Sequence, residues 1–190
     1  MAKIWQTKAS KQLDPMVEEF TSGEDIAWDQ QLIPYDIQGS LAHAQMLYSI
    51  GLLTKKDWQL LQEGLQRLLT QYQQGKFVLT KADEDCHSAI EDRLGVVGKK
   101  IHTGRSRNDQ VLAALKLFYK DKLDEINIKV RNLEKVFEQF AGKYVGVPMP
   151  GYTHMQKAMP SSVALWAGNF AAMLSDDLGL VEAAYVYIDQ

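Results

Sequence analysis

The strongest constraint on the fold is a long apolar repeat in the second half of the chain. Apolar side chains recur every seven residues from Leu112 to Phe140, and a second row runs beside the first. The first row is Leu112, Tyr119, Ile126, Leu133 and Phe140, and the second is Leu123, Val130, Phe137 and Tyr144. Two such rows over four heptads are typical of a helix in a bundle or coiled coil. We therefore predict one long helix from about Val111 to the Gly146–Pro150 segment.

Shorter helical patterns precede this repeat. Residues 36–49 carry apolar side chains at helical spacing and end before Gly51, a typical residue after a helix C-terminus. Thr54 opens a second helix with a capping-box pattern, and Gly75 ends it. Before these helices we expect residues 1–30 to form an irregular arm with a turn near residues 21–23. These patterns predict an all-α fold.

A dense polar string, IHTGRSRNDQ, stands directly before the long helix. Asn108 or Asp109 suits the N-cap position of that helix. The free N–H groups and partial positive charge of the helix N-terminus add to the charges of Arg105 and Arg107. Because an arginine fork matches a carboxylate bidentately, the string predicts an anion site, most simply for carboxylates. The alternative is a well-capped helix start with solvated arginines.

A third helical pattern lies upstream of this string. Its apolar stripe is Cys86, Ile90 and Leu94. His87 and Glu91 are four residues apart on an adjoining face, which is also typical of an ordinary solvated His–Glu pair. Zinc binding is poorly supported, because the metalloprotease spacing requires a second histidine and none follows.

A second polar string, YTHMQK, lies between Pro150 and Pro160. We expect a loop there, whose backbone N–H groups are free to bind a ligand. His154 is flanked by hydroxyl, amide and ammonium side chains, although a loop histidine is more often a solvated surface residue. Ser161 or Ser162 suits the N-cap of a last helix.

Three segments together resemble one enzyme family. The string HTGRSRNDQ resembles a signature segment of argininosuccinate lyase, within the fumarase/aspartase superfamily. Residues 83–91 (DEDCHSAIE) resemble the acidic helix of that family, and residues 150–160 (PGYTHMQKAMP) resemble its second conserved segment. The chain departs from the family near its start, where Trp-Gly-Gly-Arg-Phe is usual, in the segment that usually offers a serine to the substrate, and at Met159, where glutamine is common.

The resemblance implies a fold, a reaction and an assembly. It implies a small helical N-terminal domain over residues 1–103, followed over residues 104–190 by the first long helices of a central helical bundle. The implied reaction is the reversible elimination that converts argininosuccinate to arginine and fumarate, the last step of arginine biosynthesis. It requires no metal or organic cofactor, and no nucleotide-binding fingerprint is found in the sequence. The implied assembly is a homotetramer with sites shared between subunits.

The resemblance also implies roles for individual residues. His154 matches a histidine that transfers a proton or polarises the substrate, and Thr153 matches a substrate-binding threonine. The residues that we expect to bind or line the substrate are Arg105, Arg107, Asn108, Thr153, Gln156, Asp85 and His87. Asp85 is implied to lie near the substrate or to position Arg107.

Bulk properties exclude several other classes of protein. The net charge of −3 provides no electrostatic footprint for nucleic-acid binding. Apolar residues make up 46 % of the chain and charged residues 24 %, as in ordinary globular proteins. The single cysteine and the lack of an apolar leader at the N-terminus indicate a cytoplasmic protein. Residues 158–175 are uncharged, but their serines and prolines favour a buried helix over a membrane span.

Two rival interpretations stay open. Another superfamily member, such as adenylosuccinate lyase, fumarase or aspartase, would also release fumarate, but its first segment does not read HTGRSRND. A non-catalytic relative, such as the lens delta-crystallins, would keep the fold without activity.

The two polar strings stand at opposite ends of the predicted long helix. At 1.5 Å per residue, Leu112 and Tyr144 are roughly 50 Å apart, which exceeds the length of a substrate of this class. A site that uses both strings therefore requires more than one subunit. The family's Gly-Ser-Ser-x-Met-Pro loop, which supplies a catalytic serine, has no counterpart in these 190 residues, so we expect them to be inactive alone and to be the N-terminal part of a longer enzyme.

Overall fold

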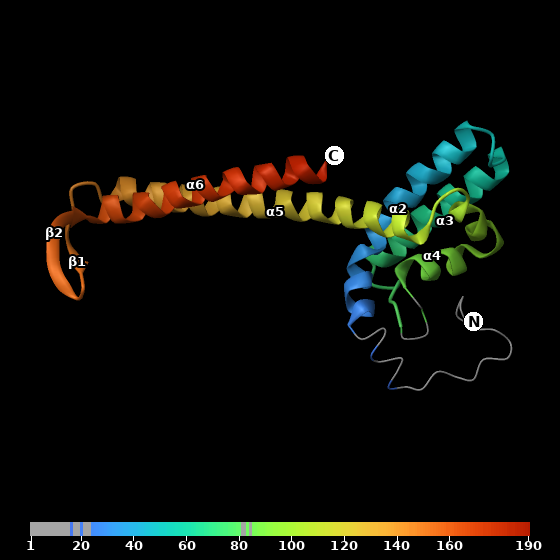
Figure 1. Ribbon diagram of the computed structural model, residues 1–190, viewed down its shortest axis with the longest axis horizontal. Helices are drawn as coiled ribbons and strands as arrows, with labels where there is room; N and C mark the ends of the chain where they lie inside the picture. Colours follow the sequence, from blue (N-terminus) through green and yellow to red (C-terminus); the bar gives the residue numbers. More distant parts are fainter. Residues whose placement is uncertain (1–15, 17–19, 21–23, 81–82, 84) are drawn as a thin grey trace. The chain divides into compact units, whose positions relative to one another are not determined.

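The computed structural model of the chain describes residues 16, 20, 24–80, 83 and 85–190. The helices are α2 (Asp25–Ser49), α3 (Lys55–Gln73), α4 (Cys86–Leu94), α5 (Arg107–Lys143) and α6 (Val163–Ile188), with the 3-10 helix η1 (Gly95–His102) between α4 and α5 (Figure 1). The strands β1 (Pro148–Thr153) and β2 (Gln156–Ser162) form a two-stranded antiparallel sheet. The predicted helical fold is confirmed. No helix in the described part of the chain combines the length and apolarity needed to cross a membrane.

Two of the predicted helix starts were wrong. The first helix begins at Asp25 and not near residue 36, and it accommodates Pro34 in its interior. The predicted long helix is one element as expected, but it begins at Arg107, four residues before Val111. The expected turn at residues 21–23 lies outside the described residues, as do Trp5 and its neighbours.

By internal contacts the chain divides into two units, Met1–Phe118 and Tyr119–Gln190. The first turns of α5 belong to the first unit because Gln110 and Ala114 are buried there and Phe118 packs against its core. This division by internal contacts falls within α5. A boundary at residue 103 stays a prediction, since a helix that begins in one unit and continues into the next has no single boundary.

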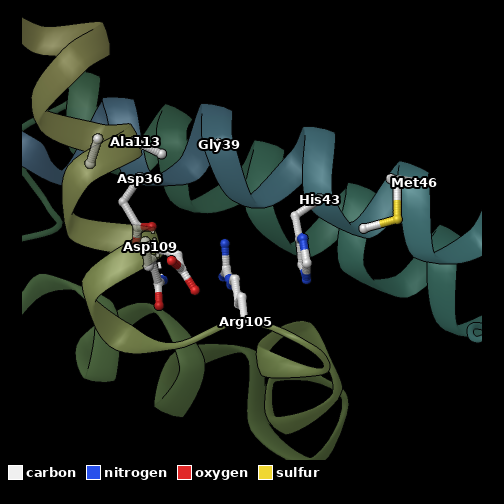
Figure 2. Close-up of a pocket in the computed structure, with 9 residues that line it drawn as sticks. Asp36, Gly39, His43, Met46, Arg105, Asp109 and Ala113 are labelled. Carbon is white, nitrogen blue, oxygen red and sulfur yellow. Dashed lines mark hydrogen bonds between the residues drawn. The ribbon is translucent and has the colours of Figure 1, made fainter.

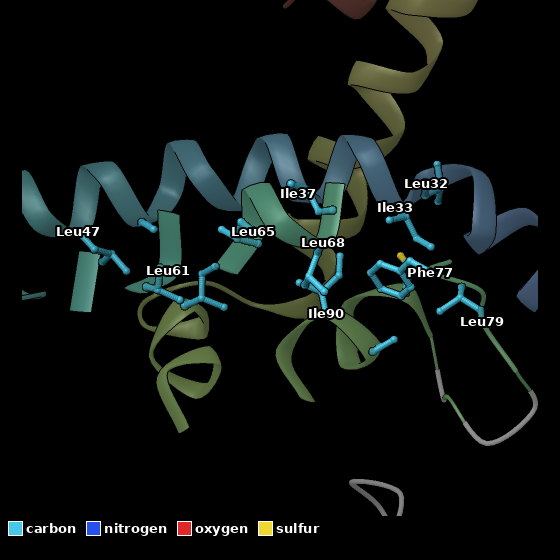
Figure 3. Close-up of a cluster of buried hydrophobic side chains, with 14 of the residues drawn as sticks. Leu32, Ile33, Ile37, Leu47, Leu61, Leu65, Leu68, Phe77, Leu79 and Ile90 are labelled. Carbon is cyan, nitrogen blue, oxygen red and sulfur yellow. The ribbon is translucent and has the colours of Figure 1, made fainter. Parts of the chain in front are cut away.

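The first unit is built on α2, α3 and α4. Thr54 caps α3 in the predicted capping box, in which its hydroxyl accepts a hydrogen bond from the Asp57 amide at 3.1 Å. The apolar faces of the three helices meet in one core (Figure 3). Its central side chains are Ile33, Ile37, Leu61, Leu65, Leu68, Phe77 and Ile90. Each large aliphatic or aromatic side chain buried there stabilises the fold by about 1.5–3 kcal/mol relative to an exposed one.

Gly98 is expected to be the least tolerant glycine of this unit. A Cβ at this position of η1 would lie 2.2 Å from the Glu91 carbonyl oxygen and 2.9 Å from the Leu94 Cβ. Because α4 would have to move, we expect Gly98→Ala to lower the free energy of unfolding by about 1–3 kcal/mol, measured by urea denaturation. Gly39→Ala is the matched control, since no described atom lies within 4 Å of its Cβ position and alanine favours the helix. Equal stability of the two variants would contradict the close packing of η1 on α4.

The second unit consists of the rest of α5, the hairpin and α6. Phe137 of α5 stacks on Phe170 of α6 with ring centroids 5.4 Å apart, and Arg131 pairs with Glu182 at 2.9 Å. The second apolar row of α5 is partly buried, whereas every member of the first row is exposed, including Leu133 at 47 %. Two helices therefore leave one predicted apolar face of α5 uncovered.

The expected loop at residues 150–160 is a β-hairpin, so this prediction was wrong. Pro148 is the register partner of Ser162, and Thr153 is the register partner of Gln156. His154 and Met155 form the turn with φ of 47° and 61°, the left-handed backbone that a two-residue hairpin turn requires. The hairpin signal was missed because neither turn residue is the usual asparagine or glycine. As predicted, Ser162 caps α6, accepting a hydrogen bond from the Leu165 amide at 3.0 Å.

Candidate active site

The first polar string forms a sharp turn followed by a capped helix start. Gly104 adopts φ of 74°, which glycine tolerates without strain. Ser106 and Asp109 form a reciprocal capping box, with the Asp109 amide 3.2 Å from the Ser106 hydroxyl and the Ser106 amide 2.8 Å from the Asp109 carboxylate. The N-cap is therefore Ser106 and not Asn108 or Asp109. This shift of the helix start places Arg107 and Asn108 in the first turn of α5, beside its free N–H groups.

Arg107 is held by side chains of α4 and α5. One terminal nitrogen donates to the Ser88 hydroxyl at 3.0 Å, and the other is 3.5 Å from the Gln110 amide oxygen. Its Nε is 3.6 Å from the Asp85 carboxylate, and its Nη1 is 4.0 Å from that of Glu91. Asp85 is itself fixed as the N-cap of α4, with the Ser88 amide 2.6 Å from its side chain. The arginine is thus aligned before any ligand arrives, while 27 % of its side chain is exposed.

Arg105 has different surroundings from Arg107. Its guanidinium donates to the Ser40 hydroxyl of α2 at 3.0 Å, and burial lowers its pKa. It lines a pocket of about 320 Å³ between α2 and the start of α5 (Figure 2). The other lining residues are Asp36, Gly39, His43, Met46, Asp109, Gln110, Ala113 and Ala114. The alternating string therefore directs its two arginines to different partners, and only Arg107 contacts Asp85 and Ser88.

His87 is a buried histidine with a carboxylate partner. It is 2 % exposed, and its Nδ1 is 3.0 Å from the Asp36 carboxylate. Glu91 contacts His102 at 3.3 Å, so the solvated His87–Glu91 pair considered from the sequence is not formed. Sequence reasoning missed Asp36, although one signal could have revealed it. A charged residue directly before Ile37, on the apolar side of its helix, requires a buried partner.

Asp36, Cys86 and His87 bring three potential metal ligands within 4.8 Å of one another. Asp36 Oδ2 and His87 Nδ1 lie 3.0 Å apart as an ion-pair contact, and neither atom makes a hydrogen bond with another group in the described part of the chain. Burial strongly raises the pKa of the Cys86 thiol, which disfavours the thiolate that a metal would bind. Because burial keeps the Cys86 thiol protonated, we assign these three side chains to the buried polar core and not to a metal centre.

The second polar string places three of the predicted site residues at one end of the hairpin. Thr153 and Gln156 are paired across the last register position, and His154 follows in the turn. All three side chains are exposed. A further pocket of about 650 Å³ lies beside the hairpin. It is lined by Met149, Pro150, Gly151, Tyr152, Ser161, Leu165, Trp166 and Asn169. Thr153, His154 and Gln156 are thus accessible to a ligand within this unit.

A family model described as "Lyase" matches residues 7–189. The chain belongs to this lyase family. One curated relative is argininosuccinate lyase of Thermotoga neapolitana. Its sequence is 45 % identical to this chain, in an alignment that covers 99 % of this chain and 48 % of that protein. A second is argininosuccinate lyase of Parabacteroides distasonis, 46 % identical over 96 % of this chain and 42 % of that protein. The chain therefore spans about half the length of the curated relatives it matches.

Solved structures support the fold of the lyase-family chain. A fumarate lyase:delta crystallin from Brucella melitensis matches with a TM-score of 0.76 and 16 % identity over 96 % of this chain and 49 % of that chain. EDDS lyase in complex with formate matches with a TM-score of 0.72 and 24 % identity over 95 % of this chain and 36 % of that chain. The resemblance inferred from the three segments is confirmed at the level of the family.

Proposed function

We propose that the chain is the N-terminal part of an argininosuccinate lyase, which cleaves argininosuccinate to arginine and fumarate. The observation that carries this proposal is the prealigned Arg107 at the start of α5, held at 3.0 Å by Ser88 and at 3.6 Å by Asp85. The identity of 45 % to the Thermotoga neapolitana enzyme over 99 % of this chain supports the choice of substrate.

The proposed chemistry follows from the charge that develops during elimination. A base removes a proton from the carbon next to a substrate carboxylate, which gives an aci-carboxylate with two negative charges on one group. Fixed cations and N–H donors stabilise that group most in the transition state. Arg107, Asn108 and the N-terminus of α5 provide such donors at one place. The carbon–nitrogen bond then breaks, and the leaving guanidino nitrogen accepts a proton.

The hairpin residues are proposed to act on the same substrate. His154 is proposed as the imidazole that transfers the proton or polarises the substrate, and Thr153 and Gln156 as substrate-binding residues. Their exposure at one hairpin end supports this assignment. Asp85 is proposed to position Arg107, consistent with its 3.6 Å contact. His87 is proposed to line the buried side of the site, where its ring contacts Asp36 at 3.0 Å. The reaction as proposed needs no cofactor.

We further propose a homotetramer in which different subunits provide the two polar strings to each site. The exposed first row of α5 supports association, because a continuous apolar stripe of this length favours burial against other helices. On α6, Leu165, Trp166 and Met173 are exposed as well. α5 is one uninterrupted helix of 37 residues, as the proposal of shared sites requires.

The decisive experiment uses the purified full-length enzyme. Incubation with argininosuccinate is expected to release fumarate, followed by its ultraviolet absorbance, and adenylosuccinate or aspartate is expected to give no comparable rate. Fumarate release from adenylosuccinate or aspartate instead would assign the protein to another branch of the superfamily. A folded full-length protein that releases fumarate from none of them would be a structural relative.

A further inference from the structure

One buried carboxylate joins three helices beneath the arginine string. Asp36 of α2 is 2 % exposed. Its Oδ1 accepts hydrogen bonds from the Gln110 amide nitrogen of α5 at 2.9 Å and from the Ser40 hydroxyl at 3.3 Å. Its Oδ2 is 3.0 Å from Nδ1 of His87 in α4. Two hydrogen-bond donors and the His87 imidazole thus converge on a single acidic side chain.

An ionised carboxylate can only accept hydrogen bonds, so it sets the direction of each chain of hydrogen bonds that begins on it. Gln110 must turn its amide nitrogen toward Asp36, which leaves its amide oxygen facing Arg107 at 3.5 Å. Ser40 must donate its proton to Asp36, which leaves its oxygen free to accept from Arg105 at 3.0 Å. Both chains therefore end on an arginine of the polar string.

We propose that Asp36 is a positioning residue of the anion site, aligning Arg107 through Gln110 and Arg105 through Ser40. This inference rests on the proposed function, in which Arg107 binds a substrate carboxylate. Asp36 is 2 % exposed, and in this proposal it acts on the substrate only through its neighbours.

The energetics favour a positioning role over a purely stabilising one. A buried charge gives little net stability, because a well-packed apolar group is often as stable at the same place. A directional role also distinguishes aspartate from its isostere asparagine. In Asp36→Asn, the new amide can donate as well as accept a hydrogen bond. The Gln110 side-chain amide can then rotate so that its NH₂ group, in place of its oxygen, faces the N–H groups of Arg107, which removes the acceptor that aligns the guanidinium.

The test compares kcat/KM of the full-length enzyme with that of three variants. Asp36→Asn is expected to lower kcat/KM about 10- to 100-fold, the size of effect that follows from small misplacement of a binding group. Gln110→Met, which keeps the volume but removes the amide, is expected to lower it to a similar extent. Ile37→Val is the matched control on the same helix, because it removes a buried methyl group and touches neither chain of hydrogen bonds. We expect Ile37→Val to change kcat/KM by less than about twofold while lowering the melting temperature.

A double-mutant cycle separates positioning from general damage. In an Arg107→Lys background, Asp36→Asn is expected to lower kcat/KM by a clearly smaller factor than in the wild type, because lysine has no fork for Gln110 to align and only the Arg105 chain remains. The same 10- to 100-fold loss in both backgrounds would overturn the proposal. If Asp36→Asn does not fold, the same cycle with Gln110→Met decides the Arg107 branch.

Crystal structures of the wild type and of Asp36→Asn or Gln110→Met provide a readout that is independent of activity. We expect the Arg107 guanidinium to move away from the Ser88 hydroxyl in the variant. An unchanged guanidinium would overturn the proposal whatever the substrate is. A wild-type enzyme that does not cleave argininosuccinate would instead overturn the proposed function, and the comparison of Arg107 would still decide the role of Asp36.

Discussion

Two inactive full-length variants, Arg107→Ala and His154→Asn, are expected to regain activity when they are unfolded together and refolded as a mixture. Arg107 opens α5, and His154 lies in the hairpin that follows its other end in sequence. If one subunit supplies Arg107 and another supplies His154, random assortment leaves roughly a quarter of the sites with neither change. The measurement is the fumarate-release rate of the mixture, with each variant refolded alone as the baseline.

A pair of variants from the same string provides the matched control. Arg107→Ala and Asn108→Ala both alter the start of α5, so every site in their mixed oligomers carries one of the two changes. This mixture is expected to stay inactive. Mass spectrometry of the intact oligomers would verify that subunits have mixed. Mixed oligomers of Arg107→Ala and His154→Asn without activity would show that one chain supplies both residues to a site.

The substitution Arg107→Lys is expected to lower kcat/KM roughly 10- to 1000-fold, corresponding to about 1.5–4 kcal/mol for a charge-assisted pair in a site. Lysine keeps the charge but loses the planar fork that grips a carboxylate at two points. The present partners of Arg107, at 3.0 Å from Ser88 and 3.5 Å from Gln110, would not orient an ammonium in the same way. Thermal stability is expected to change little, because 27 % of the Arg107 side chain is exposed.

Arg93→Lys is the matched control for that substitution. Arg93 lies in the same unit, pairs with Asp83 at 3.1 Å and stacks 4.3 Å from the centre of the Phe77 ring. Its replacement is expected to lower the melting temperature and to leave kcat/KM within about threefold. If Arg107→Lys instead lowered the melting temperature sharply while activity per folded molecule held, Arg107 would be a structural residue.

Much of the fold follows from local sequence patterns. The heptad rows predicted α5 as a single helix, and the Thr54 capping box and Ser162 cap were both found where expected. Such features depend on residues a few positions apart, so the order of residues alone determines them. The start of α5 was misplaced because Ser106, Asn108 and Asp109 can all cap a helix, and only the capping box between Ser106 and Asp109 selects one.

The buried part of the candidate site could not be predicted in this way. Asp36 and Gln110 are 74 residues apart, and no local pattern connects them. The same is true of the contact between Arg105 and Ser40, which depends on how α2 crosses the start of α5. The polar strings thus identified the segments of the site, while tertiary packing decided which arginine meets which partner.

The left-handed backbone at His154 determines how the role of its ring can be measured. With φ of 47°, the residue occupies a conformation that costs most side chains free energy, and asparagine is among the few that adopt it readily. An alanine in this turn would remove the imidazole and also strain the hairpin, so a loss of activity would mix two causes. A β-branched residue would open the turn and displace Thr153 and Gln156 with it. Asparagine preserves the backbone conformation of the turn. The activity lost in His154→Asn therefore measures the contribution of the imidazole alone.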